Sequence, residues 1–196
     1  MMTEFEVVLN RLPELLRYTV SQYGETFLRV ASALGITLPT GPILEQLITV
    51  WASSEFVASA CIREPALLAD LLSGSDLSVS FAPGEYAARL DRQVADAADE
   101  TRLAVALRRF RRREIIRIAW RDLAGLAGLE ETMSDLSELA EVAVSATLDR
   151  LHTWQCQRFG VPHDAKGRPQ QLVVLGMGKL GGRELNYSSD IDLVFI

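Results

Sequence analysis

The sequence predicts an α+β protein in which a mainly helical N-terminal region leads into the first strands of a sheet. Over residues 4–160, apolar side chains recur at helical spacing between glycine, proline and serine breaks. Residues 163–170 are polar and rich in helix breakers, and two apolar runs around a glycine-rich turn follow them. We therefore expect a helical region over residues 1–170 and the start of a second domain over 171–196.

Glycines, prolines and capping residues divide the helical region into its elements. Gly35 is expected to end a pair of helices over 4–11 and 13–34, and Pro42 lies at the start of the next helix. Shorter helices end near residue 72, and a loop covers 73–83. A long helix is expected over about 84–123. Another begins near the N-cap candidate Ser134 and ends at Phe159, before Gly160.

Composition limits the classes of function. The chain has 196 residues, 48% of them hydrophobic, which is enough for one or two cored domains. A net charge of −6 disfavours nucleic-acid binding, and no apolar run approaches the roughly 18 residues of a membrane helix. The acidic N-terminus lacks a signal-peptide pattern, and the two separated cysteines, Cys61 and Cys156, indicate idle or buried thiols. We expect a cytoplasmic protein with neither a membrane nor a nucleic acid as partner.

Residues 171–196 carry the most chemical information. The apolar run 171–175 predicts an interior strand, and a second strand is expected over 190–196, where Asp190 and Asp192 lie one residue apart. Because residues i and i+2 of a strand share a face, both carboxylates are expected to project from the face opposite Ile191, Leu193 and Phe195. Paired carboxylates beside glycines suit Mg²⁺ and a phosphate chain.

The glycine turn itself admits several interpretations. Gly176, Gly178 and Gly181 match the dinucleotide-binding pattern, but only residues 183–189 remain for the helix that this pattern requires. A P-loop is excluded because Leu180 stands where Ser or Thr is needed. A structural alternative remains, in which the glycines serve packing and the aspartates make a turn cap and a salt bridge. The functional alternative is a strand, a glycine turn, a short helix and a strand that together bind phosphate, with Lys179 and Arg183 as further cations.

A glycine turn followed by an Asp-x-Asp strand resembles the DNA-polymerase-β-type nucleotidyltransferase fold. The full string over residues 176–193 resembles the bifunctional glutamine synthetase adenylyltransferase/adenylyl-removing enzyme family. Strings at 51–57, 63–65 and 110–123 are similar to helical segments of the same family, so the resemblance covers most of residues 50–196. The string over residues 185–192 resembles the N-terminal, adenylyl-removing half of such enzymes.

The resemblance implies a metal-dependent phosphorolysis, in which phosphate removes AMP from a glutamine synthetase tyrosine and leaves as ADP. It implies that Asp190 and Asp192 are catalytic and hold Mg²⁺, and that Gly181, Gly182 and Ser189 contact phosphate. Glutamine synthetase, the PII signal protein, nucleotide and phosphate are the implied partners. Two alternatives remain: adenylyl transfer from ATP to the same tyrosine, and a helical module that only binds glutamine synthetase or PII.

Polymerase-β-type sites use a third carboxylate from a later strand. The chain ends four residues after Asp192, so we expect a catalytic domain that is truncated at its C-terminus and inactive by itself.

A cluster of arginines precedes these motifs. One stripe recurs every four residues and so lies on one helix face: Arg109, Arg113, Arg117 and Arg121. The stripe either pairs with acidic neighbours such as Glu114 and Asp122, or with another helix, or it faces a phosphate or a partner. The sequence leaves these possibilities open.

Overall fold

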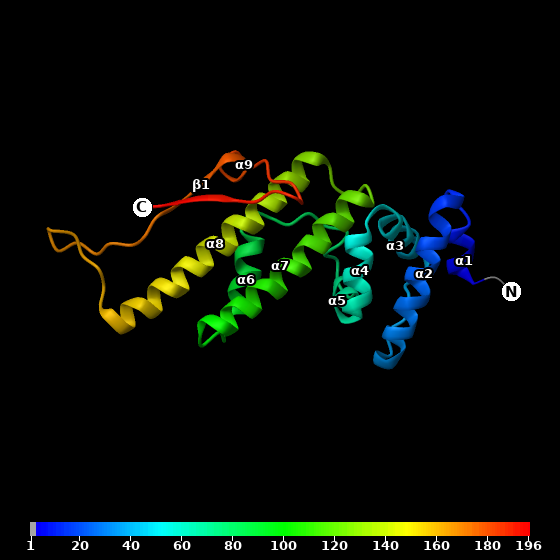
Figure 1. Ribbon diagram of the computed structural model, residues 1–196, viewed down its shortest axis with the longest axis horizontal. Helices are drawn as coiled ribbons and strands as arrows, with labels where there is room; N and C mark the ends of the chain where they lie inside the picture. Colours follow the sequence, from blue (N-terminus) through cyan, green and yellow to red (C-terminus); the bar gives the residue numbers. More distant parts are fainter. Residues whose placement is uncertain (1–2) are drawn as a thin grey trace. The chain divides into compact units, whose positions relative to one another are not determined.

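The computed structural model describes residues 3–196 and contains helices together with one small hairpin (Figure 1). The helices are α1 (Glu4–Leu9), α2 (Glu14–Ala31), the 3₁₀ helix η1 (Ser32–Leu34), α3 (Gly41–Ser53), α4 (Glu55–Arg63), α5 (Pro65–Leu72), α6 (Glu85–Val94), α7 (Glu100–Leu123), α8 (Leu129–Phe159) and α9 (Gly178–Gly181). The strands are β1 (Val174–Met177) and β2 (Asp192–Phe195), which pair antiparallel. The mainly helical α+β class is therefore confirmed.

The chain forms two compact units, each with its own core. The first contains the residues up to Ser80 together with Ile116–Gly128, and the second contains Phe81–Ile115 and Leu129–Ile196. Helix α7 contributes its C-terminal part to the first unit and its N-terminal part to the second. The division at residue 170 stays a prediction. Within residues 3–196, every helix is too short or too polar to cross a bilayer.

The first unit is a helical cluster around two buried tryptophans. Trp51 lies in the last turn of α3 and packs on Phe27 of α2 with 5.7 Å between ring centroids. The Trp120 indole N–H donates to Gln46 Oε1 at 3.1 Å. Ser54 caps α4 by accepting from the backbone N–H of Val57. The string 51–57, which carried part of the resemblance, therefore forms the α3–α4 corner of this core.

The arginine stripe has a structural role in this unit. The buried guanidinium of Arg117 donates to the carbonyl oxygens of Asp76 at 3.0 Å and Val79 at 2.9 Å. Arg121, also buried, donates to the carbonyl oxygen of Leu77 at 2.8 Å. A buried arginine needs such acceptors because burial removes its charged guanidinium from water. These two residues thus hold the loop after α5 against α7, a role that the sequence did not predict. The expected pairing with an acidic neighbour is seen at Arg113, whose Nη1 lies 2.7 Å from Glu114 Oε1.

Two helix boundaries differ from the sequence prediction. The helix expected over 84–123 is interrupted, because Asp99 caps a new helix by accepting from the backbone N–H of Arg102 at 2.8 Å. Helix α8 begins at Leu129 rather than near Ser134. Gly125, with φ at 71°, allows the chain to leave α7 in a left-handed turn, and the next helix starts soon after it. Apolar periodicity continues across both boundaries, so it does not reveal them.

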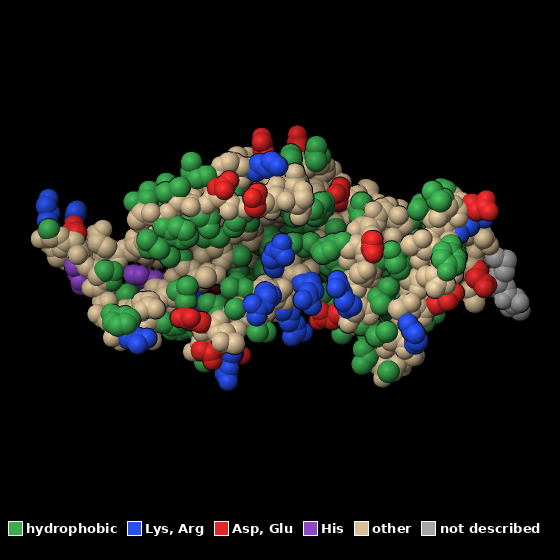
Figure 2. Space-filling view, in the orientation of Figure 1, with side chains coloured by type: hydrophobic (Ala, Val, Ile, Leu, Met, Phe, Trp, Pro, Cys, Tyr) green, Lys and Arg blue, Asp and Glu red, His purple; other side chains and the backbone are tan. Residues whose placement is uncertain are grey.

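The second unit places the β1–β2 hairpin alongside α8 (Figure 1). The register pairs Val174 with Phe195 and Met177 with Asp192. Both strands are shorter than expected: the first begins at Val174 rather than at residue 171, and the second begins at Asp192 rather than at 190. The expected interior strand is instead half of a hairpin, in which Leu175 and Met177 are exposed and Val174 is half-buried. Hydrophobic side chains are visible on the surface of the molecule in Figure 2.

Candidate functional site

The turn after β1 requires glycine at defined positions. Gly178 has a φ of 54°, a conformation that side chains with a Cβ rarely adopt. A Cβ on Gly181 would lie 2.6 Å from the carbonyl oxygen of Gly176, so the chain passes itself too closely for any side chain. A Cβ on Gly182 would meet its nearest neighbour, the Gly178 carbonyl oxygen, at 3.6 Å, which is ordinary contact. The short helix falls on these glycines, as α9, and not over residues 183–189 as expected.

The two aspartates lie on different sides of the hairpin. Asp192 is the first residue of β2, and its Oδ2 lies 3.6 Å from the position that a Cβ on Gly178 would take. Leu193 lines a cavity beneath the hairpin, so alternation places Asp192 on the opposite, outer face. Asp190 precedes the strand and lines that cavity together with Ile191. The prediction that both carboxylates project from one strand face is wrong, because the regular strand does not extend to Asp190.

The segment between α9 and β2 is held by an asparagine. Asn186 Oδ1 accepts from the Ser188 N–H at 3.1 Å and from the Ser189 hydroxyl at 2.9 Å. The same Ser189 hydroxyl oxygen accepts from the Asn186 N–H at 3.2 Å. Leu185 is buried beside this turn, and its N–H donates to Ser137 Oγ on α8 at 3.3 Å. The approach to Asp190 is therefore fixed to α8, and the Ser189 hydroxyl is part of that turn.

The two expected cations have different surroundings. Arg183 has a φ of 55°, and its Nη1 donates to Glu141 Oε2 on α8 at 2.9 Å. Lys179 lies on α9 with its side chain exposed, and within residues 3–196 it makes no side-chain hydrogen bond or ion pair. Arg183 thus ties the glycine turn to α8, whereas Lys179 is available to an anion.

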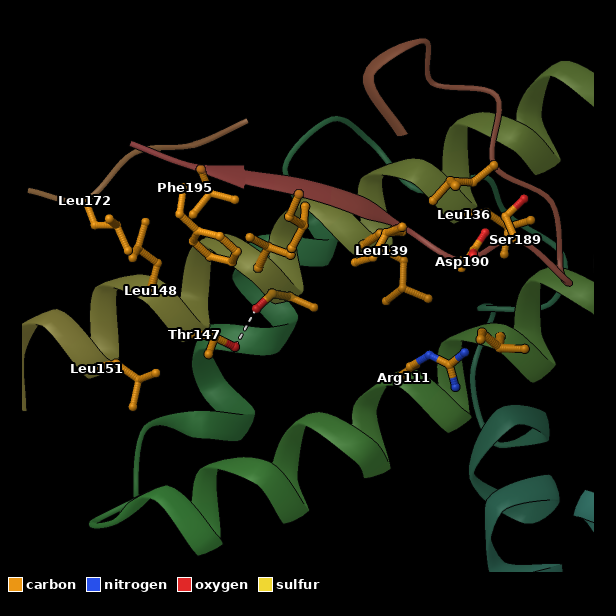
Figure 3. Close-up of a pocket in the computed structure, with 18 of the residues that line it drawn as sticks. Arg111, Leu136, Leu139, Thr147, Leu148, Leu151, Leu172, Ser189, Asp190 and Phe195 are labelled. Carbon is orange, nitrogen blue, oxygen red and sulfur yellow. Dashed lines mark hydrogen bonds between the residues drawn. The ribbon is translucent and has the colours of Figure 1, made fainter. Parts of the chain in front are cut away.

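A cavity of about 720 Å³ lies beneath the hairpin (Figure 3). Its walls come from the inner face of the hairpin, from α8 and from the N-terminal part of α7. Most of the lining is apolar, including Leu148, Leu151, Leu172 and Phe195 at one end. Arg111, Ser189 and Asp190 lie toward the other end, which we call the polar end, and Leu136 lies beside them.

The carboxylates have the chemistry of a magnesium ligand pair. Asp190 and Asp192 are exposed, and among the described residues neither makes a side-chain hydrogen bond or an ion pair. Within residues 3–196, no cluster of three or more His, Cys, Asp or Glu is placed to hold a metal. Mg²⁺ commonly takes only one or two protein carboxylates and completes its shell with water and substrate phosphates. Two unpartnered carboxylates beside an open turn fit that mode of binding.

Sequence reasoning missed two parts of this region. Arg111 lies in the arginine cluster but off its four-residue stripe, so the spacing gave no reason to single it out. Asn186 lies within the string 176–193, but its role in the turn was not predicted. An asparagine two and three residues before serines often closes a turn with its side chain, and this spacing was the signal that could have revealed it.

Comparison with known proteins places the chain in a family. The profile of glutamate-ammonia ligase adenylyltransferase matches residues 44–196. A bifunctional glutamine synthetase adenylyltransferase/adenylyl-removing enzyme from Thioalkalivibrio sulfidiphilus is 49% identical over 187 residues, which are 95% of this chain and 19% of that protein. The enzyme of the same name from Nitrosococcus oceani is 46% identical over 95% of this chain and 20% of its own length.

A third enzyme of the same name, from Pseudomonas aeruginosa, is 48% identical over 78% of this chain and 16% of its own length. The chain thus spans about a fifth of the length of the first two relatives. With the family profile covering residues 44–196, the chain belongs to the glutamate-ammonia ligase adenylyltransferase family.

Proposed function

We propose that this chain is the N-terminal part of a bifunctional enzyme of this family and carries the opening of its adenylyl-removing site. The observation that carries the proposal is the position of Asp192, whose carboxylate lies beside the glycine turn with no protein partner among the described residues. The names of the relatives, which combine adenylyl transfer and adenylyl removal on glutamine synthetase, supply the chemistry. Glutamine synthetase as substrate, PII as regulator and the cytoplasm as location belong to the same proposal.

The proposed reaction is a phosphorolysis. An oxygen of inorganic phosphate attacks the phosphorus of AMP-tyrosine, the bond from phosphorus to the tyrosine oxygen breaks, and ADP forms. The tyrosine oxygen leaves with the bonding electrons and ends with the proton that the attacking hydrogen phosphate gives up. Such transfers depend on positioning and on neutralising the charge of the phosphoryl group. A bound Mg²⁺ supplies charge neutralisation at the phosphate oxygens.

The residues of this chain would divide the remaining work. Asp190 and Asp192 would hold the cation, and Gly181 and Gly182 would keep side chains away from the phosphate oxygens. Lys179 would add positive charge from the exposed side of α9. Ser189 would donate its O–H to a phosphate oxygen by turning it away from Asn186 Oδ1. Arg183 would act mainly by holding the turn on α8.

The test is the substitution Asp192→Asn in the full-length enzyme, with Asp190→Asn beside it. We expect each to abolish Mg²⁺-dependent ADP formation from adenylylated glutamine synthetase and phosphate, because a neutral amide is a poor ligand for a hard cation. Asp91→Asn, which changes an exposed carboxylate on α6, is the matched control and should leave the rate unchanged. Near-normal turnover in Asp192→Asn would sink the proposal.

The same variants separate the two directions of chemistry. The complete enzyme is given ATP and unmodified glutamine synthetase, and the incorporation of AMP is measured. If Asp192→Asn abolishes ATP-driven incorporation and leaves phosphorolysis intact, this site performs adenylyl transfer instead. If phosphorolysis alone is lost, the adenylyl-removing assignment stands.

A further inference from the structure

We propose that Arg111 of α7 binds a phosphate group of the substrate at the polar end of the cavity beneath the hairpin. The inference rests on the proposed function, since it names a residue that would recognise the substrate of that site. Its basis is the position of Arg111, its lack of a protein partner among the described residues, and the chemistry of the groups around it.

Arg111 lies at the end of the cavity where Asp190 lies. Both residues line it, and Figure 3 shows them together at one end, with Leu151 and Leu172 at the other. Helix α8 runs the length of the cavity, since Leu136 and Leu151 both line it and lie about 22 Å apart along a helix axis. Arg111 and Asp190 thus share the end of the cavity to which α8 contributes Leu136.

The guanidinium of Arg111 is available to a ligand. Arg113 pairs with Glu114 at 2.7 Å, and Arg117 and Arg121 donate to backbone carbonyls. Arg111 is exposed and, within residues 3–196, makes no side-chain hydrogen bond or ion pair. It therefore presents five N–H donors and a full charge to a ligand.

The charges around Arg111 favour a phosphate as the ligand. Asp190 is the carboxylate that lines the same cavity, and among the described residues no ion pair joins it to Arg111. A cation bound at Asp190 needs further oxygen ligands, and arginine binds phosphate oxygens in a bidentate way. A phosphate group satisfies both at once, because it offers oxygens to the cation and to the guanidinium.

Two substrates carry this chemistry at the proposed site. One is the attacking inorganic phosphate, and the other is the phosphoryl group that is joined to tyrosine. Arg111→Gln removes the charge and the fork of donors, Arg111→Lys keeps the charge alone, and both are measured in the full-length enzyme. Arg108→Gln is the matched control, since Arg108 is an exposed arginine on the same helix that does not line the cavity.

We expect Arg111→Gln to raise one KM at least tenfold, with a smaller change in kcat, while Arg108→Gln matches the wild type. A rise in the KM for inorganic phosphate identifies the attacking group as the ligand. A rise in the KM for adenylylated glutamine synthetase identifies the transferred phosphoryl group. Arg111→Lys should recover part of the lost affinity, since a lysine restores charge without the bidentate fork.

Unchanged KM values in Arg111→Gln, or the same change in Arg108→Gln, would overturn the inference. So would an Arg111→Lys variant as impaired as Arg111→Gln with a lowered melting temperature, because that pattern indicates a structural role. Calorimetric titration of the same variants with AMP and with inorganic phosphate, in Mg²⁺, separates this inference from the proposed function. If the wild type forms no ADP but Arg111→Gln still loses AMP or phosphate binding, the proposed function fails and the role of Arg111 stands.

Discussion

Substituting Gly181 by alanine tests the close passage of the chain at the glycine turn. The new Cβ would lie 2.6 Å from the Gly176 carbonyl oxygen, and ordinary contact begins at 3.4 Å, so the turn must open by about 0.8 Å. Alanine is favoured over glycine inside a helix by about 0.5–1 kcal/mol, whereas overpacking costs about 1–3 kcal/mol. The overpacking cost prevails because the opposing atom belongs to the backbone and no side chain can rotate away.

The expected result is a larger effect on turnover than on folding. A misplacement of about 1 Å in a catalytic site costs up to about 100-fold in rate, so Gly181→Ala should lower ADP formation by about 10- to 100-fold in the full-length enzyme. Gly182→Ala is the control for the fold, because its Cβ would lie 3.6 Å from the nearest atom and its φ is −83°. It should leave the melting temperature unchanged, whereas Gly181→Ala should lower it. Equal melting temperatures in the two variants would refute the steric reasoning.

Two further predictions concern groups outside the site. Burial raises the pKa of the Cys61 thiol to about 12, although a hydrogen bond with the Trp51 side chain lowers this pKa by a smaller amount. At pH 8 a thiol reagent should therefore label the half-exposed Cys156 and leave Cys61 unreacted until the protein unfolds. In the folded Cys156→Ala variant only Cys61 remains, so fast labelling of that variant would contradict this expectation. Hydrogen bonds from the Arg168 N–H and side chain, and from the Lys166 N–H, lower the pKa of Asp164 in the folded state. The stabilisation of this loop by the ionised Asp164 is therefore fully present above about pH 4 and is lost as the pH falls through the lowered pKa. Exchange of the Lys166 backbone amide should accelerate over that fall in pH, and Asp164→Ala should remove this pH dependence.

The sequence predicted the fold class because its two signals are local. Helical spacing of apolar residues marks most of the helices, and glycine and proline mark many of their ends, as at Gly35. It failed at Asp99, where a side-chain cap divides one periodic stretch into two helices. Periodicity reports which face is buried, but it does not report which residue starts a new helix axis.

The candidate site shows a different limit. The pairing of glycines with two aspartates is visible in the sequence, but the start of β2 at Asp192 depends on the closed turn of Asn186 and on the anchoring of Leu185 to α8. That anchor joins residues 48 positions apart and so has no local signal. Arg111 enters the site for the same reason, since only the packing of the N-terminal part of α7 within the second unit places it on the cavity wall.

The separation of the two carboxylates limits where a shared cation can bind. Asp192 lies on the outer face of the hairpin and Asp190 lines the cavity on the inner side. Asp190 and Asp192 would hold a shared cation near the end of the hairpin where β2 begins. The glycine turn lies beside Asp192, and Arg111 lines the cavity together with Asp190. Arg111 would give a phosphate hydrogen bonds that the aspartates cannot give, so the loss of Arg111 should weaken phosphate binding even with both aspartates intact.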